Sequence, residues 1–190
     1  MVRVRQRRAS RIVQGDIIRE VDFIEYVSEK AGVVELSKVI FPLVVVLTQD
    51  CDLEQDFRFR WSRHQKPKTQ DKYLLSVLVA PLYNAEQVYL GDHLSELGLK
   101  MESINRKHSP GQYLRNNERP RFHFLNFPPD VPVVPSIVDF KHYFSVNVAY
   151  LKRLKRTNFV CRLSELFRED LSNRFAGYLS RIGLPEQGID

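Results

Sequence analysis

The chain has 190 residues, of which 43% are hydrophobic and 11% aromatic, and a formal net charge of +6. This length and composition are typical of one globular domain with a substantial core. The longest apolar run has five residues, 43–47, whereas a membrane-spanning helix needs about 18. Only two cysteines occur, Cys51 and Cys161, without the paired spacing of a zinc finger. The composition therefore argues against a membrane protein and a disulfide-stapled secreted protein, and we expect a cytoplasmic protein without a cofactor.

The positive charge is concentrated in residues 1–11. Five arginines there account for five of the six net positive charges: Arg3, Arg5, Arg7, Arg8 and Arg11. We interpret residues 1–11 as a basic N-terminal arm and residues 12–190 as a single domain. Such an arm attracts RNA or DNA by releasing counterions. The alternative is a solvated leader without a partner.

A buried strand is predicted near the centre of the first half of the chain. Residues 42–47 are apolar and rich in valine, which indicates a strand buried on both faces rather than a helix. Pro42 suits the first position of that strand, where a missing backbone donor costs least. Residues 73–82 predict a second apolar strand. The two strands are expected to be neighbours because each must satisfy its buried backbone groups.

The remaining segments predict an α+β domain. Further strands are expected over residues 16–23, 121–127 and 137–146. The segments between strands are interpreted as a polar, hairpin-like connection over residues 28–38 that contains Gly32, a short helix over residues 86–99, and a loop or exposed insertion over residues 101–118. An insertion is therefore expected at about residues 84–120. Apolar residues at steps of three and four predict a C-terminal amphipathic helix between the N-cap Ser164 and the stop signal Gly183.

Acidic groups and a cysteine follow the central strand directly, in residues 50–56. Reactive side chains at the end of a rigid strand are a common way to build a site. If the strand continued, four carboxylates would share one side and could bind Mg²⁺: Asp50, Asp52, Glu54 and Asp56. The alternative is an acidic turn that ends the strand, which is commoner, and no metal is expected.

Cys51 is a candidate nucleophile if a histidine lies beside it, and His123 is the first candidate. The alternative for Cys51 is a small buried thiol in the core. A metal-free ribonuclease needs groups that transfer protons and a cation that holds the phosphate. The predicted catalytic residues are Asp50, Cys51, Asp52, Arg121 and His123. The other candidate histidines are His64, His93, His108 and His142.

Aromatic and basic residues alternate directly after the acidic stretch. Phe57, Phe59 and Trp61 are interleaved with Arg58 and Arg60. Aromatic rings can stack on bases while arginines hold phosphates. The alternative is an edge strand whose rings pack inward. The residues predicted to bind nucleic acid are Arg3, Arg5, Arg7, Arg8, Arg58 and Arg60.

The order of several short motifs resembles the PemK/MazF-like toxins. A strand opening in Gly-Asp-Ile at residues 15–17 is followed by Pro-x-Val-Val-Val at residues 42–46, and the chain closes on a helix ending in Ile-Gly-Leu at residues 182–184. The resemblance covers both ends of the chain but not its middle. Residues 48–52, Thr-Gln-Asp-Cys-Asp, are instead similar to a looser set of uncharacterised bacterial proteins, as is the segment 174–185.

The resemblance implies an SH3-like, partly open β-barrel and a bacterial endoribonuclease of toxin or phage-defence type. The alternative function is a non-catalytic subunit that binds nucleic acid or protein in a defence or regulatory complex. An antitoxin or other partner protein and a homodimer both stay open. Phe41 stands where that family typically has its catalytic arginine before Pro42, and Ser76 is the candidate for the helper hydroxyl of the next strand.

Overall fold

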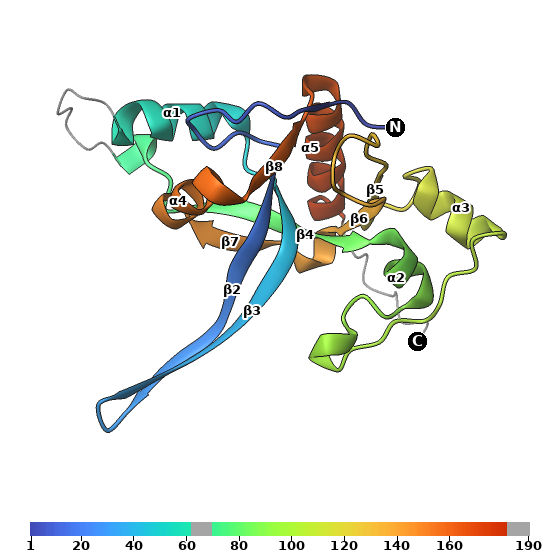
Figure 1. The fold of residues 1–190 in the computed structure, drawn as a ribbon, viewed down its shortest axis with the longest axis horizontal. Coiled ribbons are helices and arrows are strands. Elements are labelled where there is room, and N and C mark those ends of the chain that lie inside the picture. Colours follow the sequence, from blue (N-terminus) through green and yellow to red (C-terminus); the bar gives the residue numbers. More distant parts are fainter. Residues whose placement is uncertain (62–69, 182–190) are drawn as a thin grey trace, which may run out of the picture.

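The computed structural model describes residues 1–61 and 70–181. The described part contains one antiparallel sheet with the strand order β1-β8-β2-β3-β4-β6-β5, and β7 pairs with β4 beside this path. The sheet curls into a partly open barrel on which helices pack (Figure 1). The predicted α+β class and partly open barrel are therefore confirmed.

The elements follow one another in mixed order along the chain. The strands are β1 (Val4–Arg5), β2 (Asp16–Lys30), β3 (Val33–Val46), β4 (Ser76–Asn84), β5 (Phe122–Leu125), β6 (Ser136–Asp139), β7 (Phe144–Asn147) and β8 (Phe159–Leu163). The helices are α1 (Asp50–Arg60), α2 (Ala85–Leu90), α3 (Ser109–Arg115), α4 (Val148–Asn158) and α5 (Glu165–Leu179). Short 3-10 helices are η1 (Gln70–Lys72), η2 (Ser95–Leu97) and η3 (Phe140–His142).

The central strands are buried on both faces, as predicted. β3 pairs with β4, with Val45 opposite Ala80, which confirms the two apolar strands as neighbours. Ile17 and Val45 belong to one core cluster, whereas Ile18 and Val44 belong to the cluster on the other face. Alternation along a strand sends successive side chains to opposite faces, so both faces of the sheet need a cover.

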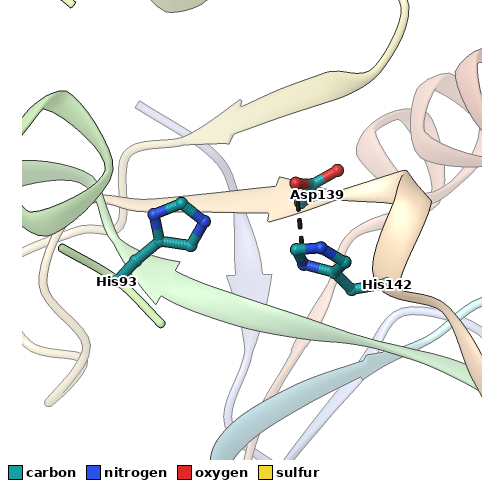
Figure 2. A group of neighbouring side chains, drawn as sticks. All are labelled: His93, Asp139 and His142. Atoms are coloured by element: carbon teal, nitrogen blue, oxygen red, sulfur yellow. Dashed lines mark ion pairs between the residues drawn. The ribbon is translucent and has the colours of Figure 1, made fainter. Parts of the chain in front are cut away.

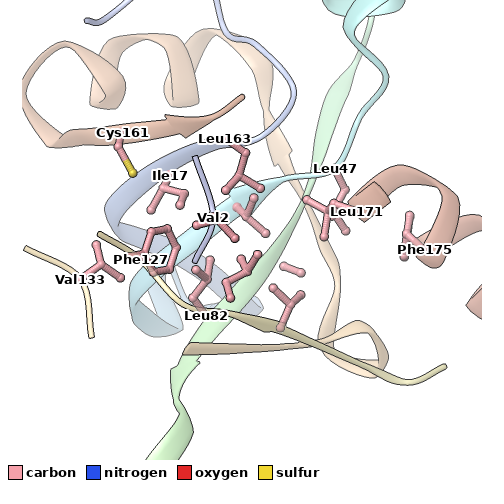
Figure 3. Packing of buried hydrophobic residues seen from close by; sticks show 14 of the residues in the cluster. Val2, Ile17, Leu47, Leu82, Phe127, Val133, Cys161, Leu163, Leu171 and Phe175 are labelled. Carbon is pink, nitrogen blue, oxygen red and sulfur yellow. The ribbon is translucent and has the colours of Figure 1, made fainter. Parts of the chain in front are cut away.

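Helices supply that cover. Leu171 and Phe175 of α5 pack into the first cluster, and Figure 3 shows the buried side chains of that cluster. Leu53 of α1 and Leu151 of α4 pack into the second cluster. The predicted C-terminal helix is therefore confirmed, although it ends at Leu179. The expected stop signal at residue 183 lies outside the described residues.

The hairpin expected around Gly32 is confirmed, but residues 28–38 continue two paired strands instead of forming a polar connection. β2 and β3 form a long hairpin that protrudes from the body (Figure 1). Its turn is Ala31-Gly32, where both residues have a positive φ, 52° and 78°. Positive φ at both central positions is typical of the tight turn that matches strand twist. Turn chemistry at two residues therefore outweighs the polar composition of the segment.

Residues 50–56 are neither a continued strand nor an acidic turn, because this segment is the first part of the helix α1. Four carboxylates therefore do not share one side, since a helix turns about 100° per residue. Asp50 and Asp52 lie in its first turn and Arg58 and Arg60 in its last turn, a distribution that complements the helix dipole. The edge-strand alternative for the aromatic and basic residues fails for the same reason.

Two smaller expectations are corrected in the second half of the chain. The loop expected over residues 101–118 contains α3, and a third core cluster joins α2 and α3 to the sheet through Val88 and Leu114. The strand expected over residues 137–146 is divided into β6 and β7 by η3. Asp139 causes the break, because its side chain accepts a hydrogen bond from the backbone N–H of Lys141.

The first five residues pack against the body of the domain, and Val4 and Arg5 form a strand of the sheet. Val2 is buried, β1 pairs with β8, and the backbone carbonyl of Arg3 accepts from the N–H of Ser164 at 2.8 Å. Among the described helices, none combines the length and apolar character that crossing a membrane requires.

Candidate functional site

Asp50 is held in an ion pair at the first turn of α1. Its two carboxylate oxygens accept hydrogen bonds from the Arg11 guanidinium at 2.7 and 2.8 Å, and Arg168 lies 3.3 Å away. Burial raises the pKa of the Asp50 carboxyl, but the hydrogen bonds and charge of Arg11, together with the Gln14 N–H and the charge of Arg168, outweigh burial and lower it. An ionised carboxylate engaged by two cations serves structure better than proton transfer. Because its guanidinium pairs with Asp50, Arg11 does not add free positive charge to the basic arm.

Cys51 and Asp52 are exposed beside each other at the same turn. The thiol Sγ lies 3.6 Å from Asp52 Oδ1 and 3.7 Å from Gln49 Oε1. The alternative of a buried thiol is therefore wrong for Cys51 and holds for Cys161, whose pKa burial raises to about 12. In the described ranges, no histidine makes a hydrogen bond or ring contact with Cys51. The alternative base at residue 64 lies outside the described residues.

His123 lies within β5, and Arg121 directly precedes that strand. Figure 1 shows β5 on the opposite side of α5 from α1, which carries Asp50, Cys51 and Asp52. Arg121 donates two hydrogen bonds to the buried carboxylate of Asp139, at 2.8 and 2.5 Å. The His123 ring is 2% exposed, and burial, helped by Arg174, lowers its pKa to about 3. The ring is therefore neutral at pH 7. The structure thus places the five predicted catalytic residues in two separate groups, and their roles stay a prediction.

Three distant segments meet in a basic groove, which we define by Arg8, Phe57, Lys152 and Arg156. These side chains line a pocket of about 280 Å³ between the N-terminal segment, α1 and α4. Arg8 donates a hydrogen bond to the backbone carbonyl of Arg156. The Lys152 ammonium lies 3.7 Å from the ring centre of Trp61 and 5.0 Å from that of Phe57. Positive charge and aromatic surface are therefore adjacent.

The other arginines predicted to bind nucleic acid have different surroundings. Arg60 is bound to the buried carboxylate of Asp56 and to the carbonyl of Leu74, so its role is to tie α1 to the following segment. Arg58 is exposed and pairs with Glu54 one turn earlier. Three remain exposed on the N-terminal segment: Arg3, Arg5 and Arg7. The exposed basic surface is thus shared between this segment, α1 and α4.

A second polar cluster lies at the other end of the sheet. His93 follows α2, Asp139 ends β6, and His142 ends η3; one ligand atom from each lies within 4.8 Å of the others (Figure 2). Burial lowers the pKa of both histidines, more than the nearby carboxylate of Asp139 raises it. Both rings are therefore neutral at pH 7, so each has one nitrogen with a lone pair that can accept a proton or bind a ligand.

Sequence reasoning named His93 and His142 as candidate partners for Cys51, and it disfavoured a zinc site because the chain has no paired Cys/His spacing. The one local signal for this cluster is the spacing of Asp139 and His142, which places both side chains on one side of a helical turn. His93 comes from the inserted segment, and no sequence spacing announces it. Comparisons of the chain with models of protein families, with curated proteins and with solved structures found no match.

Proposed function

We propose that this protein binds single-stranded nucleic acid in the basic groove. The carrying observation is the convergence of Arg8, Lys152 and Arg156 from two distant segments beside the rings of Phe57 and Trp61. Arginine and lysine neutralise backbone phosphates, and aromatic rings stack on bases that are not paired in a duplex. The combination favours a flexible single strand over a duplex, whose bases are already stacked.

Lys152 links the two parts of the groove. Burial lowers the pKa of its ammonium, and Arg156 lowers it further. A phosphate placed between these two cations would relieve their mutual repulsion, which makes the groove a favourable place for an anion. The net charge of +6 adds a field that attracts polyanions over a longer range.

The resemblance to PemK/MazF-like toxins makes RNA the first ligand to test. The curled antiparallel sheet and the C-terminal helix are the features that support this assignment and its SH3-like barrel. Binding without cleavage is the function that the geometry favours, because Asp50 is engaged by Arg11 and the candidates Arg121 and His123 lie apart from Cys51. An endoribonuclease of toxin or defence type stays a prediction from the resemblance.

Reversing the charge of Arg156 tests the groove. Arg156→Glu is expected to weaken binding of a fluorescently labelled single-stranded RNA by about 10-fold or more at low salt. The loss of one phosphate contact should also reduce the slope of log affinity against log salt by about 0.7. Fluorescence anisotropy at several salt concentrations measures both quantities. The matched control is Lys107→Glu, which changes net charge equally at an exposed position outside the groove.

Two outcomes would contradict groove binding: no binding by the wild-type chain, or equal losses in Arg156→Glu and Lys107→Glu. The same RNA samples, separated on a denaturing gel with and without EDTA, report on cleavage. Cleavage that Asp52→Ala abolishes would favour the ribonuclease prediction. Intact RNA under both conditions, with tight binding, would favour the non-catalytic function.

A second candidate function, association with another copy of this chain, is favoured by the hairpin. Beyond the body of the sheet, the outer edges of β2 and β3 have no neighbouring strand among the described residues. The hairpin also exposes large apolar side chains, including Val27, Val34 and Leu36. Open edges and exposed apolar residues are features through which two identical strands can pair about a two-fold axis.

We expect Val34→Lys to convert a dimer into a monomer, because a charge on the hairpin opposes pairing with a second copy. Light scattering during size-exclusion chromatography measures the mass in solution. The control is Leu166→Lys, which replaces an exposed leucine on α5, 73% accessible. A wild-type monomer at all concentrations, or equal dissociation by both substitutions, would contradict this assignment and leave the hairpin to a different partner protein.

A further inference from the structure

The fold brings together the side chains of His93, Asp139 and His142, three residue types that can ligate a metal ion. They come from two separate places in the chain, the segment after α2 and the end of β6 with the following η3, and their ligand atoms lie within 4.8 Å of one another. Around a tetrahedral zinc with bonds of about 2.0–2.1 Å, neighbouring ligand atoms would be about 3.3 Å apart. The ligand atoms are therefore farther apart than in a formed zinc site, and a change of side-chain rotamer would bring them to the required distance.

The carboxylate of Asp139 is oriented by groups behind it. Oδ1 accepts from the Arg121 Nε and from the Lys141 N–H, and Oδ2 accepts from the second Arg121 nitrogen. An ionised carboxylate has about four acceptor positions, so Oδ2 keeps one directed toward His142, whose Nδ1 is 3.6 Å away. Such supporting hydrogen bonds are a common feature of metal-binding carboxylates. Arg121 would therefore act as a positioning residue.

The two imidazoles have surroundings that suit ligands. His142 Nδ1 lies 3.0 Å from the hydroxyl of Tyr83, and the Tyr83 ring packs edge-on against both His93 and His142. These contacts limit the orientations of the rings. The His93 Nδ1 is buried and has no hydrogen-bond partner among the described residues. A buried nitrogen without a partner is costly, and a metal ion would satisfy it.

The donor set selects the class of ion. Two neutral imidazoles and one carboxylate suit zinc and related first-row transition ions, whereas Mg²⁺ and Ca²⁺ prefer oxygen ligands. Arg121 balances the charge of Asp139, so the nitrogen donors must contribute most of the affinity, which disfavours hard cations further. Three protein ligands leave a fourth position for water or a ligand, as in catalytic zinc sites.

We propose that His93, Asp139 and His142 bind one divalent first-row transition ion, with Zn²⁺ as the ion to test. His93 and Tyr83 also line a pocket of about 350 Å³ between β3, β4 and the segment after α2, so solvent reaches the set from the side of His93. This site lies at the opposite end of the sheet from the basic groove (Figure 1). It is independent of the proposed binding of nucleic acid.

Replacing His93 by Phe tests the site with little change in packing, because the new ring can keep the contact with Tyr83. Wild-type protein is expected to bind one Zn²⁺ per chain in isothermal titration calorimetry. We expect His93→Phe to lower that affinity by about 100-fold or more, because it removes a direct ligand. Loss of a residue that only supports a ligand typically costs about 10–100-fold. Co²⁺ in place of Zn²⁺ should give visible absorption bands that the variant lacks.

The controls separate this set from other groups that attract zinc. His108→Phe removes an exposed histidine, and Cys51→Ser removes the exposed thiol; neither should change the affinity. Circular dichroism checks that His93→Phe is folded, and His142→Gln, which can still hydrogen-bond to Tyr83, is a second variant. The proposal is overturned if wild-type protein does not bind Zn²⁺, if both histidine variants bind it normally, or if Cys51→Ser abolishes binding.

Discussion

Asp16→Asn is expected to lower the free energy of unfolding by about 3–5 kcal/mol, the usual cost of breaking a buried ion pair. The Asp16 carboxylate has no exposed surface and accepts hydrogen bonds from Lys155 Nζ at 2.6 Å and Arg162 Nε at 2.7 Å. It also accepts from the backbone N–H of Val13 at 2.8 Å. The substitution leaves a buried ammonium without its counter-charge, and urea unfolding followed by circular dichroism measures the loss.

The large loss of stability expected for Asp16→Asn comes from Lys155, because its ammonium is buried beside Asp16. Burial lowers the pKa of its ammonium, while the charge of Asp16 raises it, and the lysine joins α4 to the start of β2 through that one carboxylate. Asp16→Asn combined with Lys155→Met should therefore recover part of the stability, because no buried charge on α4 is then left unpaired. Glu165→Gln breaks the exposed pair with Arg5 and should cost less than about 1 kcal/mol.

A loss below 1 kcal/mol in Asp16→Asn, or a double variant less stable than the single one, would contradict this account of the network. The result also bears on the Gly-Asp-Ile motif. Gly15 has a φ of 77°, which brings the chain into position for Asp16 to reach both cations. The motif that suggested a toxin family is thus explained here by folding, so it carries no evidence about catalysis.

The central sheet was predictable because burial leaves a strong local pattern. Val44 and Val45 face opposite core clusters, so an uninterrupted apolar run was required, and the run was visible in the sequence. The same holds for α5, whose buried Leu171 and Phe175 recur at helical spacing. In both cases the residues that make the contacts are close together in the chain.

α1 could have been recognised from charge rather than from hydrophobicity. Its apolar face is small, with Leu53 the buried apolar residue, so the helical period is weak. The pairs Glu54–Arg58 and Asp56–Arg60 have the i, i+4 spacing that supports a helix. Reading these charges as an alternating strand led to the hypothesis that the carboxylates would share one side if the strand continued.

The candidate sites depended on contacts between distant segments, which a single sequence does not reveal. Arg8 meets Lys152 and Arg156 only because the N-terminal segment lies along α4. His93 meets Asp139 only because the inserted segment packs against β4 and β6. Residue types at these positions could be named from the sequence, but their grouping follows from the fold.

Acidification is expected to destabilise the protein through His123. Its pKa is lowered to about 3 in the folded state by burial and by Arg174, whereas an unfolded histidine has a pKa near 6.5. Between these values the unfolded state binds more protons, so stability falls as the pH falls through this window. At pH 4 the contribution of this residue to the loss should be about 3 kcal/mol relative to neutral pH.

His123→Leu separates this effect from general acid denaturation. His123 Nδ1 has no hydrogen-bond partner among the described residues, so an apolar side chain should keep the stability at pH 7 within about 1 kcal/mol. The variant should then lose less stability than the wild type between pH 6.5 and pH 4 in urea titrations. The same replacement at the exposed His108 should leave the wild-type pH dependence unchanged. Parallel curves for wild type and His123→Leu would show that the His123 site accommodates the charged ring, and a role for this residue in proton transfer would then regain support.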